Sequence, residues 1–262
     1  MSETALSAAL MQRFGETPDV PEEWAEIPAL QALATRGSCR SFAARPVDTA
    51  MLETLCALAL CAPSKSDLQQ RDILIVTNAK LLEELKSLLD AQSWIADAPA
   101  MIVFLANNRR QRQLQQMHDL PFPNDHLDAL FNASVDAGIA LAFFMAAAEA
   151  AGLGCCPIST IRNHLPRVKD LLALPDHVFP VAGMAVGYPD ATPDVSPRLP
   201  LSKTVHRDRF ADISEEEIRS YDTRRLAGQR GPAWSDAKAR MYAEPQRTDF
   251  AAFLRDIGFS LE

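Results

Sequence analysis

Apolar residues along this chain follow two periods, one typical of strands and one typical of helices. Continuous apolar or β-branched runs predict strands at 72–77, 99–106, 155–159 and 178–187. The first two runs have the composition of strands covered on both faces. Apolar residues at helical spacing predict helices at 47–59, 80–89, 127–151 and 161–172. Four strands among so many helices favour an α+β or α/β domain whose sheet is wrapped by helices.

The helical pattern at 127–151 is the longest, and alanine and glycine dominate it. Small side chains let a helix approach another backbone closely, so we expect a central helix packed on several sides. Part of that packing can be against a second subunit. The uncharged run at 137–148 is too short to span a bilayer.

The remaining segments are more polar. Residues 1–28 contain several prolines and predict an arm or short helix ahead of the main domain, which we place at 29–262. Residues 107–126 are rich in Gln, Arg and Pro and predict an excursion or mobile loop. After a proline-rich segment, the end of the 190–262 region predicts surface helices with a loop around 224–232.

Charge and cysteine content exclude several classes of protein. A net charge of -8 and a pI near 5.2 argue against a nucleic-acid surface, which needs a basic face. Five cysteines with no C-x-x-C pair predict neither a disulfide framework nor a zinc site. We interpret them as reduced thiols of a cytoplasmic protein. The first ten residues have no basic segment followed by an apolar core, so we expect no secretory signal there.

The most compact set of donors is at 35–42, Thr-Arg-Gly-Ser-Cys-Arg-Ser-Phe. If this stretch forms a helical turn, Arg36 and Arg40 lie on the same side. Each guanidinium is a planar fork that suits two phosphate oxygens, and Ser38 can add a hydroxyl. The alternative is a solvated basic face on an ordinary helix. The loop at 62–66, Ala-Pro-Ser-Lys-Ser, likewise exposes amides and hydroxyls that can face either a ligand or water.

Other candidate motifs lack the context that their chemistry needs. The Gly152-Leu153-Gly154 segment follows a helix instead of a strand, and its sixth position is proline, so it is not a dinucleotide fingerprint. No Gly-Lys-Ser/Thr phosphate loop occurs. The His and Asp residues at 118–126 have no metal-ligand spacing, and we predict no metal site. We also find no Ser/His/Asp or Cys/His set, and we name no catalytic residue.

Four segments in order carry a family resemblance: RGSCRSF at 36–42, APSKSDLQ at 62–69, the small-residue helix ending at 152–154, and Gly-Tyr-Pro at 187–189. Together they resemble the nitroreductase family of FMN-dependent oxidoreductases. In the tail, SPRLP at 196–200, Val-His at 205–206 and Trp-Ser-Asp at 234–236 resemble its oxygen-insensitive NADPH nitroreductase and flavin reductase branch. The resemblance covers the chain from about residue 30 to the C-terminus. It implies an α+β fold with a mostly antiparallel central sheet, in an intertwined homodimer with one FMN in each of two interface clefts.

The resemblance also assigns roles to individual residues. Phosphate and ribityl contacts fall to Arg36, Ser38, Arg40 and, from the far end of the chain, Arg198. The resemblance assigns Ser64 and Ser66 to the pyrimidine and ribityl side of FMN, and Gln92 to the edge of the isoalloxazine ring. Backbone N–H groups at Ser159 and Thr160 are assigned to O4 and N5 of the flavin, with Arg162 nearby. Gly37, Lys65, Pro157 and Ile158 complete the predicted cofactor-binding set. Ser196 stands where this branch usually has a lysine on the phosphate.

The implied function is FMN-dependent oxidation of NADPH or NADH, followed by reduction of a nitroaromatic, a quinone or a free flavin by ping-pong hydride transfer. One alternative is another flavin reaction on the same fold, such as dehalogenation or dehydrogenation. A second is a low-turnover FMN-binding protein, for which the missing lysine at position 196 is the only support.

Overall fold

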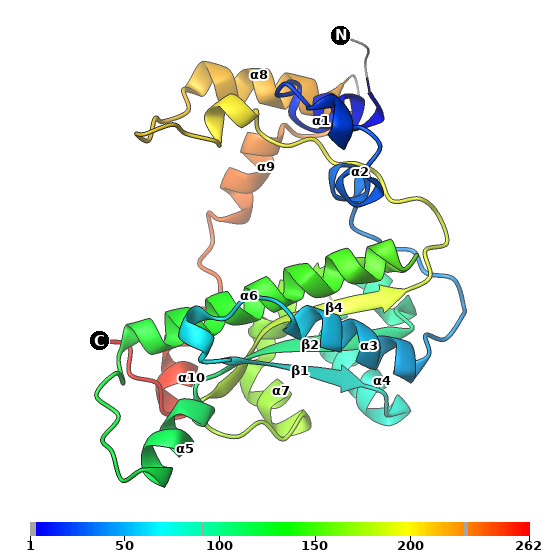
Figure 1. The fold of residues 1–262 in the computed structure, drawn as a ribbon. Helices are drawn as coiled ribbons and strands as arrows, with labels where there is room; N and C mark the ends of the chain where they lie inside the picture. The colour runs from blue at the N-terminus through cyan, green and yellow to red at the C-terminus, as the bar shows by residue number, and fades with distance from the viewer. Residues whose placement is uncertain (1–3, 91, 228–229) are drawn as a thin grey trace. The chain divides into compact units, whose positions relative to one another are not determined.

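The computed structural model describes residues 4–90, 92–227 and 230–262. The chain folds as two compact units, each built from segments that are distant in the sequence (Figure 1). The smaller unit comprises Met1–Gly37 and Asp194–Gln246, and the larger comprises Ser38–Pro193 and Arg247–Glu262.

The larger unit is built on a four-stranded antiparallel sheet with strand order β1-β2-β4-β3. The strands are β1 (Arg71–Val76), β2 (Ala100–Asn107), β3 (Gly154–Ile158) and β4 (Val178–Gly187). All four predicted strands are therefore confirmed. The expected cover on both faces holds for β2, which is buried throughout, but it is wrong for β1. Because β1 lies at the edge of the sheet, its four central residues are only half-buried.

Successive side chains of β2 enter two different cores, because side chains alternate between the two faces of a strand. Met101, Val103 and Leu105 belong to a cluster with α4 (Ala79–Leu88), η3 (Ser93–Asp97), η4 (Ser159–His164) and α7 (Leu165–Leu171). Ala100, Ile102 and Phe104 belong to a second cluster with α3 (Thr49–Leu60) and α6 (Leu127–Ala150). The sheet is thus the middle layer between two layers of helices.

Local sequence explains where several of these helices begin. The Asp48 carboxylate caps α3, because it accepts a hydrogen bond from the N–H of Ala50 at 2.9 Å. Asn78 caps α4 in the same way, accepting from the N–H of Leu81 at 3.0 Å. Helix α6 is capped by the His126 ring, which accepts from the N–H of Asp128 at 3.3 Å, and it packs on α3 and the sheet.

Two segments of the larger unit differ from their sequence predictions. The polar 107–126 region contains a helix, α5 (Arg109–Met117), whose Gln111 is buried. Helix α10 (Phe250–Asp256) is not a surface helix, because Phe253 and Leu254 are buried in a third cluster with Phe179. The aromatic and aliphatic residues at 250–259 recur at helical spacing, and this signal would have predicted a buried face.

The smaller unit is helical in the described residues. It contains α1 (Ala5–Phe14), η1 (Glu22–Trp24), α2 (Pro28–Thr35), η5 (Leu201–Lys203), α8 (Glu215–Leu226) and α9 (Trp234–Met241). Helices α1 and α2 share a small apolar cluster around Leu6, Ala9 and Ala34. Capping boxes start α1 at Thr4 and α8 at Ser214. In the second box, hydrogen bonds from Lys203 and Ser214 to the Glu217 carboxylate lower its pKa to about 2.

A glycine at the end of β4 gives a first testable prediction. A Cβ on Gly187 would lie 2.7 Å from Cδ of Pro99 and 2.8 Å from Cδ1 of Phe42. Because the proline ring cannot rotate away, we expect Gly187→Ala to lower the free energy of unfolding by about 1–3 kcal/mol. Gly183 lies on the same strand and is the control, since a Cβ there has no neighbour closer than 3.6 Å. Urea unfolding of both variants at equal concentration checks the prediction, and equal losses would contradict it.

Candidate functional site

The double-arginine stretch is extended and not helical. Helix α2 ends at Thr35, and Arg36 already has an extended ψ of 144°. The stretch therefore does not form the helical turn that would place Arg36 and Arg40 on one side. The segment follows the sheet instead: the N–H of Cys39 donates to the carbonyl of Cys155 at 3.0 Å, and Phe42 forms a bridge with Pro189. In an extended chain Ser38 and Arg40 share a face, while Cys39 points the other way and is buried.

Arg40 lies beside two other groups of the larger unit. Its guanidinium carbon is 6.0 Å from the centroid of the Trp94 ring, and the Trp94 indole N–H donates to the Gln92 side-chain carbonyl at 3.2 Å. The structure thus brings the predicted residues Arg40 and Gln92 together through Trp94, which the sequence interpretation did not single out. The arrangement offers a cation, an aromatic face and an amide on one surface.

The predicted flavin-ring contacts at 157–160 lie where β3 becomes η4. Pro157 is exposed on the edge strand, where a missing N–H costs no ladder bond, and Ile158 is buried. The first N–H groups of η4 come from Ser159 and Thr160, and such groups have no partner within the helix. Arg162 donates to the carbonyl of Val181, so this part of its side chain holds η4 to β4.

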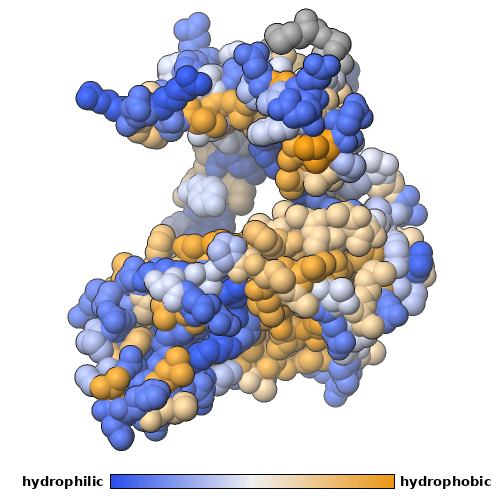
Figure 2. All heavy atoms as spheres, viewed as in Figure 1, coloured by the Kyte–Doolittle hydropathy of each residue, from blue (hydrophilic) through white to orange (hydrophobic). Residues whose placement is uncertain are grey.

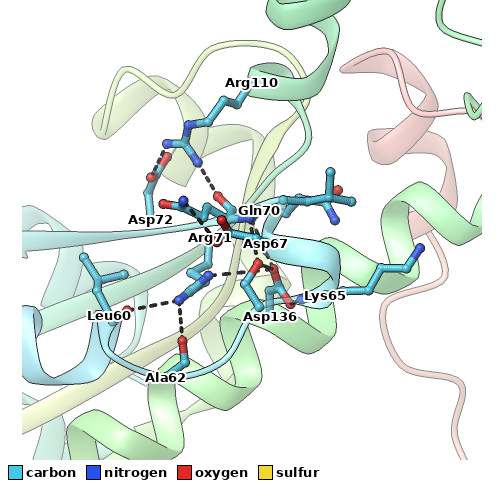
Figure 3. A network of polar contacts seen from close by, with 12 residues as sticks. Leu60, Ala62, Lys65, Asp67, Gln70, Arg71, Asp72, Arg110 and Asp136 are labelled. Atoms are coloured by element: carbon cyan, nitrogen blue, oxygen red, sulfur yellow. Dashed lines mark hydrogen bonds and ion pairs between the residues drawn. The ribbon is translucent and has the colours of Figure 1, made fainter.

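The loop at 62–70 is held by a carboxylate of α6 (Figure 3). Asp136 accepts hydrogen bonds from the Ser64 hydroxyl at 2.8 Å, the Lys65 N–H at 3.0 Å and the Gln70 N–H at 3.2 Å. The Ser64 oxygen also accepts from the N–H of Gln69 at 2.6 Å. The hydroxyl proton of Ser64 is therefore already used, whereas the Lys65 and Ser66 side chains are exposed.

Within one protomer these groups do not form one site, because they lie at diagonally opposite corners of the sheet. The 62–70 loop leads into β1, whose first residue Arg71 pairs with Ala106 at one end of β2. Cys39 contacts β3, at the other edge, and Val186 beside it pairs with Ala100 at the other end of β2. Three strand spacings of ~4.8 Å and six residues at ~3.4 Å separate the corners, which gives a diagonal distance of about 25 Å.

Three further predicted residues, Arg36, Gly37 and Arg198, lie in the smaller unit, and Arg13 joins their segments. The Arg13 guanidinium donates to the carbonyls of Ala34, at 2.9 Å, and Arg36. Its own carbonyl accepts from the N–H of Arg198 at 2.7 Å and from the Arg224 side chain at 3.4 Å. Four arginines from α1, the end of α2, the 198 segment and α8 therefore meet in this unit. The sequence interpretation treated 1–28 as an extension and missed Arg13 and Arg224.

None of the cysteine thiols is among the predicted cofactor-binding groups. None of the five cysteines forms a disulfide in the described residues, which also contain no group of three His, Cys, Asp or Glu side chains placed to hold a metal. Burial raises the pKa of the Cys56 thiol to about 11 and also raises that of Cys39. Cys61, by contrast, is exposed.

These differences predict selective thiol modification. The thiolate is the reactive form, so burial and a raised pKa protect Cys39 and Cys56. We expect iodoacetamide at pH 8 to label Cys61 in the native protein at least about tenfold faster than either buried thiol. Peptide mass spectrometry after timed quenching measures the rates. Comparable labelling of Cys39 would contradict its assignment as a buried, inert residue.

Comparison with known proteins agrees with this geometry. The sequence profile of the nitroreductase family matches residues 33–188, and the profile of the family's C-terminal domain matches residues 196–262. The fold and the sequence therefore define a single class: this chain belongs to the nitroreductase family.

Individual relatives match over nearly their whole length. An FMN reductase [NAD(P)H] of Bacillus subtilis is 30% identical over 89% of this chain and 98% of its own. An oxygen-insensitive NADPH nitroreductase of Salmonella typhimurium is 31% identical over 89% and 98%. The NADPH:FMN oxidoreductase of Vibrio harveyi, solved in complex with NAD+, superposes with a TM-score of 0.81 at 28% identity, over 88% of this chain and 97% of that one.

Proposed function

We propose that this protein is an FMN-dependent oxidoreductase that takes electrons from NADPH or NADH and passes them to a nitroaromatic, a quinone or a free flavin. The observation that carries the proposal is the match to the FMN reductase and the NADPH nitroreductase over 98% of their lengths. That match includes both the sheet and the C-terminal segment on which the predicted FMN residues lie.

The residues present fit a flavin mononucleotide. The group has an anionic phosphate, a polyol and a planar ring edged with carbonyl oxygens and nitrogens. The larger unit offers Arg40, the Trp94 face and the Gln92 amide on one surface. Beside the Ser159 and Thr160 N–H groups, the Thr160 hydroxyl oxygen is buried and has no hydrogen-bond partner among the described residues. A bound polar group can supply the partner that this hydroxyl lacks.

FMN, when bound, supplies the hydride acceptor and donor chemistry. The chain's own residues bind and orient it. We assign Arg40 and Ser38 to the phosphate and ribityl chain, with Arg36 and Arg198 as further phosphate ligands, because guanidinium forks make charge-assisted bonds with phosphate. We assign the Ser159 and Thr160 backbone N–H groups to the ring edge, where preorganised donors stabilise negative charge that develops on reduction.

We further propose a homodimer in which each site is shared. Since the 64–66 loop and Arg40 occupy opposite corners of one sheet, a single flavin can meet both only if a second copy brings its own loop to the Arg40 corner. Helix α6 provides the surface for this contact. Eight of its nine exposed residues are apolar, namely Leu127, Phe131, Val135, Gly138, Ala142, Phe143, Ala146 and Ala150. Figure 2 shows hydrophobic residues gathered over α6 and α3.

The same helix is long and apolar enough to cross a membrane by length and composition. We interpret it as the core helix of a cytoplasmic protein, because its opposite face is buried against the sheet and carries the charged Asp136. Exposed apolar faces of this size on a sheet-packed helix mark protein interfaces. Small residues at 138, 142 and 146 permit close approach of a second helix.

The visible absorption spectrum tests the proposed function. We expect the purified protein to carry a flavin band that bleaches when NADPH or NADH is added without oxygen, and that returns when a quinone or nitroaromatic follows. A protein that binds FMN but never bleaches would be a binding protein without turnover. Colourless protein that refuses added FMN at micromolar concentration would overturn the proposal.

A further inference from the structure

We propose that Asp136 is a positioning residue that sets the conformation of the 62–70 loop, and through it the cofactor contacts of Lys65 and Ser66. This inference rests on the proposed FMN function for its catalytic consequence only. Asp136 lies in the middle of α6 with 1% of its surface exposed, and the sequence interpretation gave it no role.

The donors of the loop converge on this one carboxylate. One oxygen of Asp136 accepts from the Ser64 hydroxyl and the Gln70 N–H, and the other accepts from the Lys65 N–H. Both ends of the loop are thereby tied to the same turn of α6, although they lie 66–72 residues before it in the chain. Figure 3 shows the loop closing around the carboxylate.

The backbone carbonyls of the loop and of the helix end before it accept hydrogen bonds from a separate set of side chains, two arginines and a glutamine. Arg71, 4.0 Å from Asp136, donates to the carbonyls of Leu60 at 3.1 Å and Ala62 at 2.7 Å. From α5, Gln111 donates to the carbonyl of Leu68, and Arg110 to that of Gln69. Helix α5, predicted as a mobile loop, is thus part of the scaffold that fixes the cofactor loop.

Such a dense set of contacts is required because the loop backbone is unfavourable on its own. Ser66, Asp67 and Gln69 have φ values of 49°, 54° and 50°, in the left-handed region that residues other than glycine rarely adopt. Conformations of this kind persist only where surrounding contacts over-determine them, and they concentrate at functional sites. Within the described loop, each backbone N–H that donates to a side chain donates either to Asp136 or to Ser64, which itself donates to Asp136.

The geometry requires a side chain whose two oxygens both accept hydrogen bonds, which a carboxylate provides and an amide does not. A carboxylate accepts on both oxygens, whereas asparagine replaces one acceptor by an NH2 donor. In Asp136→Asn the NH2 group would face either the Lys65 N–H or the donors Ser64 and Gln70, and Arg71 would lose its buried counter-charge. The loop would then lose hydrogen bonds that hold its left-handed residues in place.

The test compares Asp136→Asn with Asp128→Asn, which is the same substitution on the same helix. Asp128 is 56% exposed and contacts the Lys65 ammonium at 3.7 Å, so its loss removes a nearby negative charge without touching the loop backbone. We expect amide hydrogen exchange at Lys65 and Gln70 to accelerate at least about 100-fold in Asp136→Asn and less than about threefold in Asp128→Asn. We also expect the FMN dissociation constant to rise at least about tenfold in Asp136→Asn only, and the shape of the bound flavin's visible band to change.

The exchange measurement is made on protein without FMN, so it decides the loop's conformation even if the proposed function fails. Wild-type protein that refuses FMN would defeat the function, and the catalytic consequence with it. Protected Lys65 and Gln70 amides in Asp136→Asn would overturn the positioning role itself. So would accelerated exchange with unchanged FMN affinity and an unchanged flavin band. Should Asp136→Asn fail to fold, Ser64→Ala removes two bonds, the one that the hydroxyl donates to Asp136 and the one that it accepts from the Gln69 N–H. Faster exchange at the Gln69 amide then supports the role, and unchanged protection overturns it.

Discussion

Replacing Phe131 with aspartate is expected to convert the proposed dimer into monomers. Phe131 is 63% exposed in one protomer and lies in the apolar face of α6. A carboxylate buried there without a partner costs several kcal/mol. A loss of about 4 kcal/mol raises a dimer dissociation constant roughly 1,000-fold. Sedimentation velocity across a concentration series measures the change. FMN should be lost in parallel, because each proposed site needs the Arg40 corner of one copy and the 64–66 loop of the other.

Met117→Asp is the control for this prediction. Met117 is 74% exposed on α5, outside the α6 face, so the same charge is added to another exposed apolar position. We expect this variant to remain dimeric. A wild-type protein that sediments as a monomer, or a Phe131→Asp variant that dimerises as tightly as Met117→Asp, would refute the shared site.

Removing the guanidinium of Arg40 is expected to weaken FMN binding by about 1–3 kcal/mol, the range for one charge-assisted hydrogen bond, which is roughly 5- to 150-fold in affinity. Arg40 is exposed beside Trp94, so alanine leaves no buried group without a partner. Arg40→Lys keeps the charge but loses the planar fork and should lie between alanine and wild type. Titration of FMN fluorescence against protein freed of flavin measures all three affinities.

Arg45→Ala is the matched control. Arg45 follows closely in the same segment and lies over the Tyr188 ring at 3.8 Å, so its loss changes the net charge equally without removing a predicted phosphate ligand. We expect its FMN affinity to stay within about twofold of wild type. Equal losses in both variants would mean that general electrostatic attraction, and not a contact of Arg40, accounts for the effect.

The strands and most helices could be predicted from the sequence, because buried apolar residues recur along each element at the spacing of a strand or a helix. β2 reads as a continuous apolar run since both its faces are covered, and α3 reads as a helix since one stripe is apolar and Asp48 caps it. Family membership was also accessible, because its motifs occur in a fixed order along the chain. Helix α5 was not predicted because its sequence is polar and has no apolar stripe. Its buried Gln111 donates a hydrogen bond to the carbonyl of Leu68 in a distant loop, and it does not pack in an apolar core.

By itself, then, the sequence determined the four strands, the central helix and the family. Tertiary structure alone decided how the predicted site residues are grouped. The 36–41 segment is extended because the backbone N–H of Cys39 donates a hydrogen bond to the carbonyl of Cys155, over a hundred positions away. No local sequence pattern predicts that hydrogen bond. In the same way, Asp136 acquires its proposed role only when folding places it within hydrogen-bond distance of Ser64. The 64–66 loop and Arg40 lie at opposite corners because β1 and β3 are opposite edges of the sheet. Contacts of this range depend on the order of the strands, which the hydrophobic period does not specify.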